Sequence, residues 1–126
     1  MTGPARRRIF VYGTLKRGGR NHRHLGGQTF LGEARTGPGV TLYSLGDFPG
    51  MVRDPYDTEG VAGELWEVDE KCLARLDHFE GVDEGLYERV RIGLLPPHEQ
   101  ETPDTYLYAR DVTGRKPIGS TWPPVA

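Results

Sequence analysis

The stretch RIFVYGTLKRGG, residues 8–19, decides the fold, because it joins a buried strand to a glycine-rich loop. The apolar run in Arg8–Tyr12 is typical of a short buried strand, and Gly13 ends it. The next residues have the Gly, four residues, Gly spacing of a phosphate-binding loop, but Gly19-Arg20 stands where that motif needs Lys and then Ser or Thr. We therefore reject a nucleotide-binding loop. Two interpretations stay open: an ordinary turn, or a loop whose main-chain N–H groups bind a carboxylate or an oxyanion.

Outward from this stretch, the pattern predicts about six short strands and one substantial helix. The helix is expected to run from its N-cap, Asp69, to about Phe79, with Gly81 as its stop. A short helical turn is expected at 21–25, which Asn21 can cap. The other expected strands are Thr29–Ala34, Val40–Leu45, Gly60–Val68, Leu86–Leu95 and Thr105–Arg110, with turns and loops at Gly46–Thr58 and Pro96–Pro103.

These elements predict one small α+β domain, residues 8–112, with a sheet that curls towards a barrel and one main helix. A flexible N-terminal tail, residues 1–7, and a Pro-rich C-terminal tail, residues 113–126, are expected to flank it. The chain has 18 glycines and 10 prolines among 126 residues, which favours a turn-rich fold over a helical bundle. Cys72 is the single cysteine, so no internal disulfide forms. Because the apolar run at 9–12 is too short for a membrane span or a signal peptide, we expect a cytoplasmic protein with no membrane partner.

Charge is unevenly distributed, although the formal net charge is only −2. Residues 1–24 carry seven basic side chains and no acid, whereas residues 54–88 carry twelve acids against Lys71 and Arg75. The basic start could bind phosphates or a nucleic acid, or it could be a tail and a solvated loop that complement the acidic half. We favour the second interpretation and predict no nucleic-acid partner, because no aromatic residue stands among the basic residues from Lys16 to His24.

A second candidate site is the segment DHFEG, residues 77–81, at the end of the expected helix. The partial negative charge of a helix C-terminus disfavours a carboxylate at Glu80 and raises its pKa, and burial beneath the sheet would raise it further. A carboxyl group tuned in this way suits general acid–base catalysis near neutral pH. The simpler interpretation is a solvated glutamate at a helix end. Asp77 lies one turn earlier and is either a structural acceptor or a second carboxylate.

Other chemistry-bearing side chains give weaker patterns. His22 and His24 lie two residues apart on a polar loop without a third ligand, so we predict no metal site. Cys72 falls on the apolar face of the helix and is expected to be a buried hydrophobe rather than a nucleophile. The aromatic residues of the strands are expected in the core, although a tyrosine hydroxyl can point into a pocket: Trp66, Tyr87, Tyr106 and Tyr108.

Several of these motifs, in this order, resemble one known family. They are Val11–Gly18 with Asn21-His22, then Gly63–Asp69, Leu76–Gly81 and Tyr87–Arg89, and finally Thr105–Tyr108. Together they cover about Arg8–Arg110 and resemble the γ-glutamylcyclotransferase-like proteins, most strongly the γ-glutamylamine cyclotransferase branch.

The resemblance implies a small mixed-sheet α+β barrel that cleaves γ-glutamyl amides by cyclisation and releases 5-oxoproline and a free amine, without cofactor or metal. It implies that a small-molecule γ-glutamyl substrate is held by four loop residues, Tyr12, Gly13, Thr14 and Leu15. It also implies that Glu80 is the catalytic residue and that Tyr87 belongs to the pocket. In such a reaction the α-amine of the substrate attacks its own γ-carbonyl, so the enzyme supplies a general acid/base rather than a nucleophile. The alternative is a non-catalytic binding module that retains the same pocket.

Overall fold

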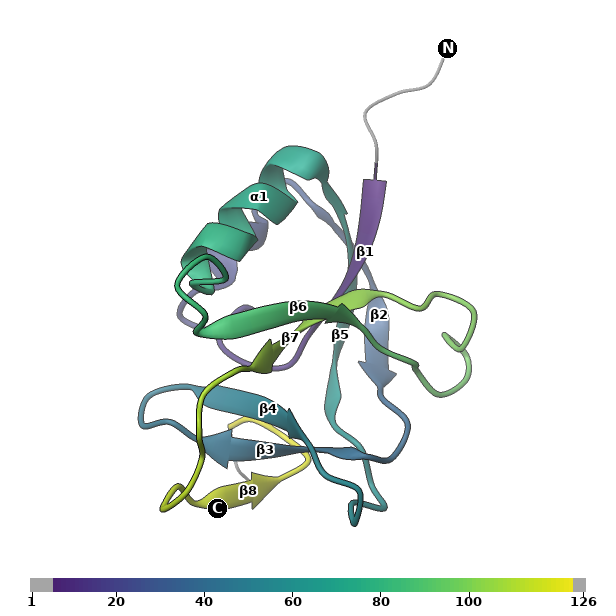
Figure 1. The fold of residues 1–126 in the computed structure, drawn as a ribbon. Coiled ribbons are helices and arrows are strands. Elements are labelled where there is room, and N and C mark those ends of the chain that lie inside the picture. The colour runs from purple at the N-terminus through teal and green to yellow at the C-terminus, as the bar shows by residue number, and fades with distance from the viewer. Residues whose placement is uncertain (1–5, 124–126) are drawn as a thin grey trace.

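The computed structural model describes residues 6–123 and contains eight strands and two helical segments. The strands are β1 Arg6–Val11, β2 Thr29–Arg35, β3 Val40–Ser44, β4 Pro49–Arg53, β5 Ala62–Asp69, β6 Tyr87–Arg91, β7 Asp104–Tyr108 and β8 Pro117–Gly119. The helical segments are the 3-10 helix η1, His22–Leu25, and the α-helix α1, Glu70–Phe79. Figure 1 shows α1 lying against one sheet, with β3, β4 and β8 on the other side of the molecule.

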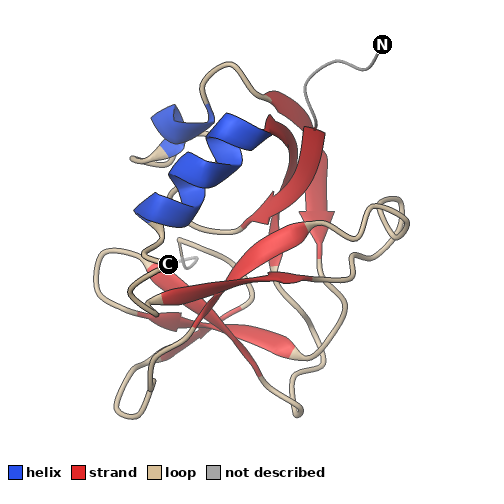
Figure 2. Ribbon diagram, turned by 45° about the horizontal axis from the view of Figure 1, so that its top comes forward, coloured by secondary structure: helices blue, strands red, loops and turns tan. Residues whose placement is uncertain are grey.

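The strands form two sheets. The five-stranded sheet has the order β2-β5-β1-β7-β6, and the three-stranded sheet has the order β4-β3-β8. Strand β1 pairs antiparallel with β5 and parallel with β7, so the larger sheet is mixed. Figure 2 shows both helical segments together on one side of the strands. The expectation of an α+β fold with a mixed sheet and one main helix is confirmed.

The second half of β1, Ile9–Val11, is buried on both faces, which explains its unbroken apolar run. Ile9 and Val11 pack into a cluster with the buried side of α1, whereas Phe10 and Tyr12 pack into a second cluster with the three-stranded sheet. Successive side chains of a strand point to opposite faces, so a strand between two cores has apolar residues at every position. The end of β1 therefore lies between the two cores, where the glycine-rich loop begins.

Helix α1 begins and ends where the local sequence predicts. The Asp69 side chain accepts a hydrogen bond from the Cys72 main-chain N–H at 2.7 Å, which caps the first turn. At the other end, Gly81 has φ of 66°, its N–H donates to the His78 carbonyl, and the Val82 N–H donates to the Asp77 carbonyl. These two bonds form a Schellman motif, which ends the helix and places Glu80 at its C-cap.

Two segments differ from the prediction. Residues 49–53 were expected among turns but form β4, because they pair in register with β3 from Val40↔Arg53 to Ser44↔Pro49. Residues 117–119 were expected in a tail but form β8 on the other edge of β3. Residues 117–119 are therefore part of the second sheet, and Ile118 and Trp122 pack against its core.

The expected N-terminal tail, residues 1–7, lies largely outside the described residues, and Arg6 and Arg7 already belong to β1. Arg7 contacts Asp104 at 2.7 Å, and Arg8 contacts Glu101 at 3.0 Å. Part of the basic start thus pairs with acidic residues of this chain. Between residues 6 and 123, no helix is long and apolar enough to cross a membrane.

Candidate active site

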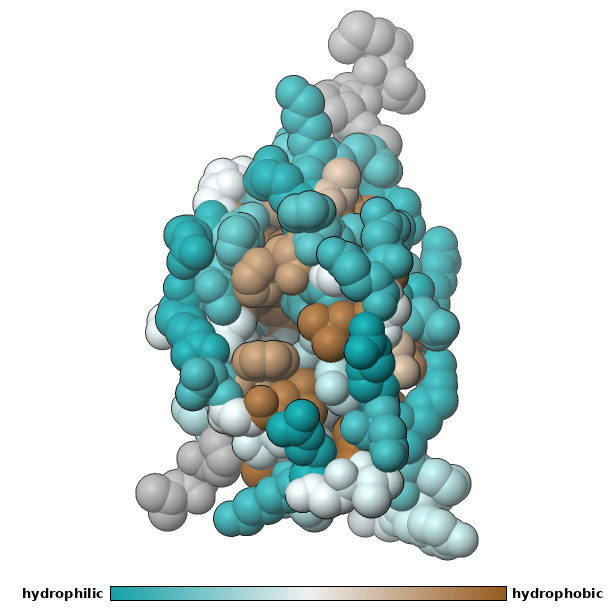
Figure 3. Space-filling view, turned by 60° about the vertical axis from the view of Figure 1, so that its left-hand side comes forward, coloured by the Kyte–Doolittle hydropathy of each residue, from teal (hydrophilic) through white to brown (hydrophobic). Residues whose placement is uncertain are grey.

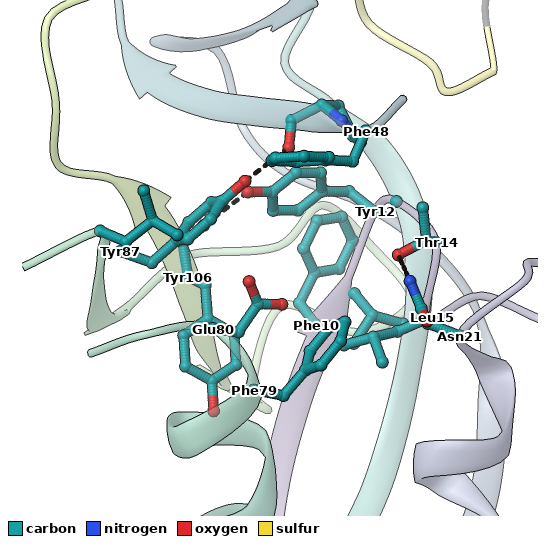
Figure 4. Close-up of a pocket in the computed structure, with 14 residues that line it drawn as sticks. Phe10, Tyr12, Thr14, Leu15, Asn21, Phe48, Phe79, Glu80, Tyr87 and Tyr106 are labelled. Carbon is teal, nitrogen blue, oxygen red and sulfur yellow. Dashed lines mark hydrogen bonds between the residues drawn. The ribbon is translucent and has the colours of Figure 1, made fainter. Parts of the chain in front are cut away.

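A cavity of about 300 Å³ opens where β1 ends, between the end of α1 and the start of β4. Figure 3 shows hydrophobic side chains gathered around a hollow on this face, within a largely hydrophilic surface. Figure 4 shows Glu80 pointing into the space between Phe10 and the tyrosine rings. The cavity is lined by Phe10, Val11, Tyr12, Gly13, Thr14, Leu15, Asn21, Phe48, Pro49, Phe79, Glu80, Leu86, Tyr87 and Tyr106.

The loop after β1 forms one wall, and its carbonyl groups are occupied by the protein itself. The Thr14 carbonyl accepts from the Asn21 N–H at 3.0 Å, and Nδ1 of His22 lies 2.9 Å from the Leu15 carbonyl oxygen. The Asn21 side chain donates to Oγ1 of Thr14 at 2.9 Å. It was expected to cap η1, but it makes no such hydrogen bond. Among residues 6–123, the N–H groups of Gly13, Thr14 and Leu15 find no acceptor. Three successive main-chain donors are therefore left in the wall of the cavity.

A buried carboxylate holds this loop from behind. Glu64 of β5 is 6% exposed and accepts from the Arg17 main-chain N–H at 3.0 Å, from Nε of Arg17 at 3.1 Å and from Nε1 of Trp66 at 3.1 Å. The Arg17 guanidinium also lies 3.7 Å from the centre of the Phe30 ring. Glu64 and Arg17 are 47 positions apart, so nothing local in the sequence predicts this contact.

Gly13 allows the loop to approach β4 closely. A Cβ atom at this position would lie 2.9 Å from Cγ of Pro49, closer than ordinary van der Waals contact. Pro49 in turn accepts a hydrogen bond from the Tyr87 hydroxyl at 2.9 Å. The need for glycine at position 13 thus includes packing against β4, in addition to the expected close approach of a ligand.

Glu80 lies opposite the loop at the C-cap of α1, and it is partly buried. Burial raises the pKa of its carboxyl group from 4.5 to about 7. The phenol groups of Tyr12, Tyr87 and Tyr106 surround it, and burial is the main cause that raises the pKa of each; the Glu80 charge adds to all three, and the hydrogen bond to Asp77 adds to the shift of Tyr106. These phenols stay protonated near neutral pH, whereas the pKa of Glu80 lies in that range.

The tyrosine hydroxyls are engaged in holding the walls together. The Tyr12 hydroxyl donates to the Tyr106 carbonyl at 2.7 Å and accepts from the Met51 N–H at 3.2 Å. The Tyr106 hydroxyl donates to Asp77 at 2.7 Å. Asp77 is therefore a structural acceptor, one of the two roles expected for it, and its side chain does not line the cavity.

The residues that the sequence singled out come together. Tyr12, Gly13, Thr14, Leu15, Glu80 and Tyr87 all line this one cavity. Asn21, Phe48, Pro49, Phe79 and Leu86 line it as well and were not predicted for the site; Phe48-Pro49 lay in the segment expected to be turns. Cys72 and Trp66 are buried in the core, as expected.

The two histidines of η1, His22 and His24, lie outside the cavity lining. His24 stacks on Phe79 with ring centres 4.5 Å apart, and its Nε2 is buried without a partner among the described residues. Burial lowers the pKa of His24. Across residues 6–123, no group of three or more His, Cys, Asp or Glu side chains is arranged to hold a metal ion.

Known proteins resemble this chain in both sequence and structure. It is 45% identical to a putative gamma-glutamylcyclotransferase of Vibrio cholerae over 59% of this chain and 62% of that protein. It is 41% identical to the gamma-glutamylaminecyclotransferase of Rattus norvegicus over 67% of this chain and 60% of that protein. For the human protein of the same name, identity is 36% over 81% of this chain and 77% of that protein. The chain therefore spans about three fifths of the length of the Vibrio and rat relatives.

Two solved structures show the same arrangement of elements. Protein ytfP from Escherichia coli has a TM-score of 0.66 and 35% identity, covering 92% of this chain and 96% of that chain. An aig2-like protein from Mus musculus has a TM-score of 0.63 and 30% identity, covering 83% of this chain and 77% of that chain. Residues 9–123, from β1 through the C-terminal segment, match the family described as gamma-glutamyl cyclotransferase, AIG2-like, and the chain belongs to that family.

Proposed function

We propose that this protein is a cyclotransferase that cleaves γ-glutamyl amides and releases 5-oxoproline and a free amine. The observation that carries the proposal is a partly buried carboxyl group, Glu80, with a pKa of about 7, in one cavity with three main-chain N–H groups that have no acceptor among residues 6–123. The first group suits proton transfer near neutral pH, and the second suits a developing oxyanion.

In the proposed reaction the substrate supplies its own nucleophile. Glu80, as the carboxylate, takes a proton from the α-amino group of the substrate, and the freed amine attacks the γ-carbonyl carbon. A carbon–nitrogen bond closes the five-membered ring, and the carbonyl oxygen becomes an oxyanion that the N–H groups of Gly13, Thr14 and Leu15 can stabilise. Protonated Glu80 then gives this proton to the leaving nitrogen as the original amide bond breaks and the oxyanion re-forms the carbonyl. The ring nitrogen, which keeps a second proton after the attack, loses it to Glu80, and Glu80 passes it to the released amine, which departs as the ammonium ion. The carboxylate is regenerated, so the cycle needs neither cofactor nor metal.

The cavity also has to fold the substrate for ring closure. Orienting two reacting groups of one molecule can contribute up to about 7–11 kcal/mol in favourable cases. In this proposal the loop holds the glutamyl group with its γ-carbonyl near Glu80, and the ring of Tyr87 closes the opposite side. A volume of about 300 Å³ suits a small substrate of this kind.

The lining favours a γ-glutamylamine as substrate. The sides of the cavity near β4 and the end of α1 carry Phe48, Phe79 and Leu86, and no basic side chain within the described range 6–123 belongs to the lining. A leaving group with a carboxylate beside its nitrogen therefore has no cationic partner there, whereas an uncharged alkyl stem next to the nitrogen has apolar contacts. The single cysteine is a buried free thiol, which suits the reducing cytoplasm where we expect the enzyme to act.

The test is mass-spectrometric detection of 5-oxoproline from a panel of γ-glutamyl donors: γ-glutamyl alkylamines, γ-glutamyl-ε-lysine, γ-glutamyl amino acids and glutathione. We expect release of 5-oxoproline from the amines and from the ε-lysine compound above the other donors. Titration calorimetry with 5-oxoproline accompanies the assay. Binding of 5-oxoproline without turnover of any donor would replace the enzyme by a binding module with the same pocket.

A further inference from the structure

Helix α1 is fastened to the large sheet at both of its ends by charged side chains. In the first turn, Glu70 lies 3.8 Å from Arg7 of β1. In the last turn, Oδ1 of Asp77 accepts from Nε of Arg89, on β6, at 2.9 Å. Arg7 and Arg89 both donate to Oδ2 of the buried Asp104, at 2.7 and 2.8 Å. The two arginines that contact the ends of the helix, Arg7 and Arg89, therefore share the carboxylate of Asp104 at the start of β7.

The anchor in the last turn also reaches the cavity. Oδ1 of Asp77 accepts a second hydrogen bond, from the Tyr106 hydroxyl at 2.7 Å, and Tyr106 lines the cavity. The Tyr106 carbonyl accepts from the hydroxyl of Tyr12, the first residue after β1. The Asp77 carbonyl accepts the Val82 N–H that closes the helix end. Asp77 thus links the turn that carries Glu80 directly to Tyr106 of β7, and through Tyr106 to Tyr12, which follows β1.

The contacts of Asp77 matter for Glu80 because Glu80 is the C-cap of a short helix, where the terminal turn is easily lost. Helix α1 has ten residues, and helices of this length depend on tertiary contacts to keep their terminal turns. We propose that Asp77 is a positioning residue: its carboxylate fixes the last turn of α1 against Tyr106 and Arg89 and thereby holds the Glu80 carboxyl group inside the cavity. The inference rests on the proposed function only for what Glu80 does once it is held there.

The consequence is a dependence of the Glu80 titration on Asp77. Burial is what raises the pKa of Glu80, so a loosened turn that admits water lowers it towards its ordinary value. The groups that face Glu80 from neighbouring elements are the phenols of Tyr12, Tyr87 and Tyr106, and His24 stacks on the adjacent Phe79. The pKa values of the phenols are raised, so these groups keep their protons as Glu80 titrates near pH 7, and burial lowers the pKa of His24, which favours its neutral form.

The experiment compares Asp77→Ala with Asp77→Asn and with Glu70→Ala, the matched change at the other end of the same helix. Glu80 is titrated directly by carbon NMR of its side-chain carboxyl, which requires no turnover. We expect Asp77→Ala to lower the Glu80 pKa by about one unit and Asp77→Asn, which keeps an acceptor oxygen, to lower it less. Glu70→Ala should leave the pKa near 7. Thermal unfolding followed by circular dichroism shows that each variant is folded.

A kinetic readout uses the same variants with a γ-glutamylamine. In Asp77→Ala we expect kcat to fall about tenfold and the acid limb of its pH profile to move to lower pH, while KM changes little because the loop is intact. An unchanged Glu80 titration in Asp77→Ala, or an equal shift in Glu70→Ala, would overturn the inference. If Asp77→Ala does not fold, Asp77→Asn decides by the same titration. If the wild type turns over no donor, the proposed function fails, but the titration still tests Asp77.

Discussion

Glu80 is a partly buried carboxyl group, and among the residues that the structure describes no Lys or Arg lines the cavity beside it. Its position at the end of α1 is visible in the sequence, because the N-cap Asp69 and the stop Gly81 are local features. The depth of its burial is not visible there, since it depends on Tyr12, which follows β1, and on Tyr87 of β6 and Tyr106 of β7. The position of Glu80 at the helix end was therefore predictable from the sequence, whereas the residues that surround it were not. Both burial and the helix end raise the pKa of Glu80.

The first prediction concerns turnover. Glu80→Gln keeps the size of the side chain but cannot accept and return a proton, so kcat for release of 5-oxoproline should fall at least ~10²-fold while the fold is retained. Mass spectrometry measures the release, and circular dichroism checks the fold. Asp83→Asn, an exposed change three residues away, is the matched control and should keep normal turnover. Wild-type turnover in folded Glu80→Gln would remove this residue from the chemistry.

The second prediction concerns stability against pH. The folded protein holds a proton on Glu80 up to about pH 7, whereas the unfolded chain releases it near 4.5. The contribution of this group to stability is complete below pH 4.5 and is lost as pH rises through 7. Glu80→Gln carries no charge to bury, so at pH 8 its free energy of unfolding should exceed that of the wild type by about 1–3 kcal/mol. Urea titrations at pH 8 and pH 4 measure the difference, which should vanish at pH 4; a difference independent of pH would contradict the assigned pKa.

At the scale of elements, local sequence features were sufficient to predict α1 and β1. The caps at Asp69 and Gly81 determine α1, and the apolar run of β1 requires two buried faces. Strand β4 was missed because its first residues, Pro49 and Gly50, are typical of turns. Its pairing with β3 decides its conformation, and that partner is not visible in the five residues themselves.

The third prediction tests the support behind the loop. Glu64→Ala leaves the Arg17 main-chain N–H and the Trp66 indole without their acceptor, so the loop loses its attachment to β5. We expect KM for a γ-glutamyl donor to rise about tenfold, with a loss of about 1–3 kcal/mol in the free energy of unfolding. Steady-state kinetics and urea unfolding measure the two effects. Glu67→Ala, on the same strand but paired with Arg8, is the control and should leave KM unchanged. A normal KM in Glu64→Ala would show that the loop keeps its shape without this carboxylate.

At the scale of the whole molecule, the site draws on segments that are distant in sequence. The cavity takes residues from the stretches 10–15, 48–49, 79–80 and 86–87, together with Asn21 and Tyr106. The members with a distinctive local motif were found from the sequence. Phe48 and Leu86 have no such motif, and partners such as Arg17 with Glu64 meet only after folding, so they could not be found in that way.

The fourth prediction concerns the C-terminal segment, which the sequence suggested was a tail. A chain that ends at Arg115 lacks β8, loses the bond from the Ala62 N–H to the Ser120 carbonyl, and uncovers the core cluster beneath Trp122. The contact of Lys16 with the Trp122 carbonyl, behind the loop, is lost as well. We expect the free energy of unfolding to fall by about 3 kcal/mol or more, measured by urea denaturation. Arg115→Ala, an exposed change in the intact chain, is the control. Equal stability of the shortened chain would mean that β8 adds nothing.

The assembly of the cavity from stretches between residues 10 and 106 has a consequence for how activity returns after denaturation. The lining is divided among segments that meet only in the folded chain, and β1, which the loop follows, is buried between both cores. An intermediate with α1 formed but the smaller sheet undocked would lack the Pro49 contact of the loop and would be catalytically silent. Recovery of turnover during refolding should therefore coincide with docking of the smaller sheet. Turnover would then report completion of the tertiary structure rather than formation of secondary structure.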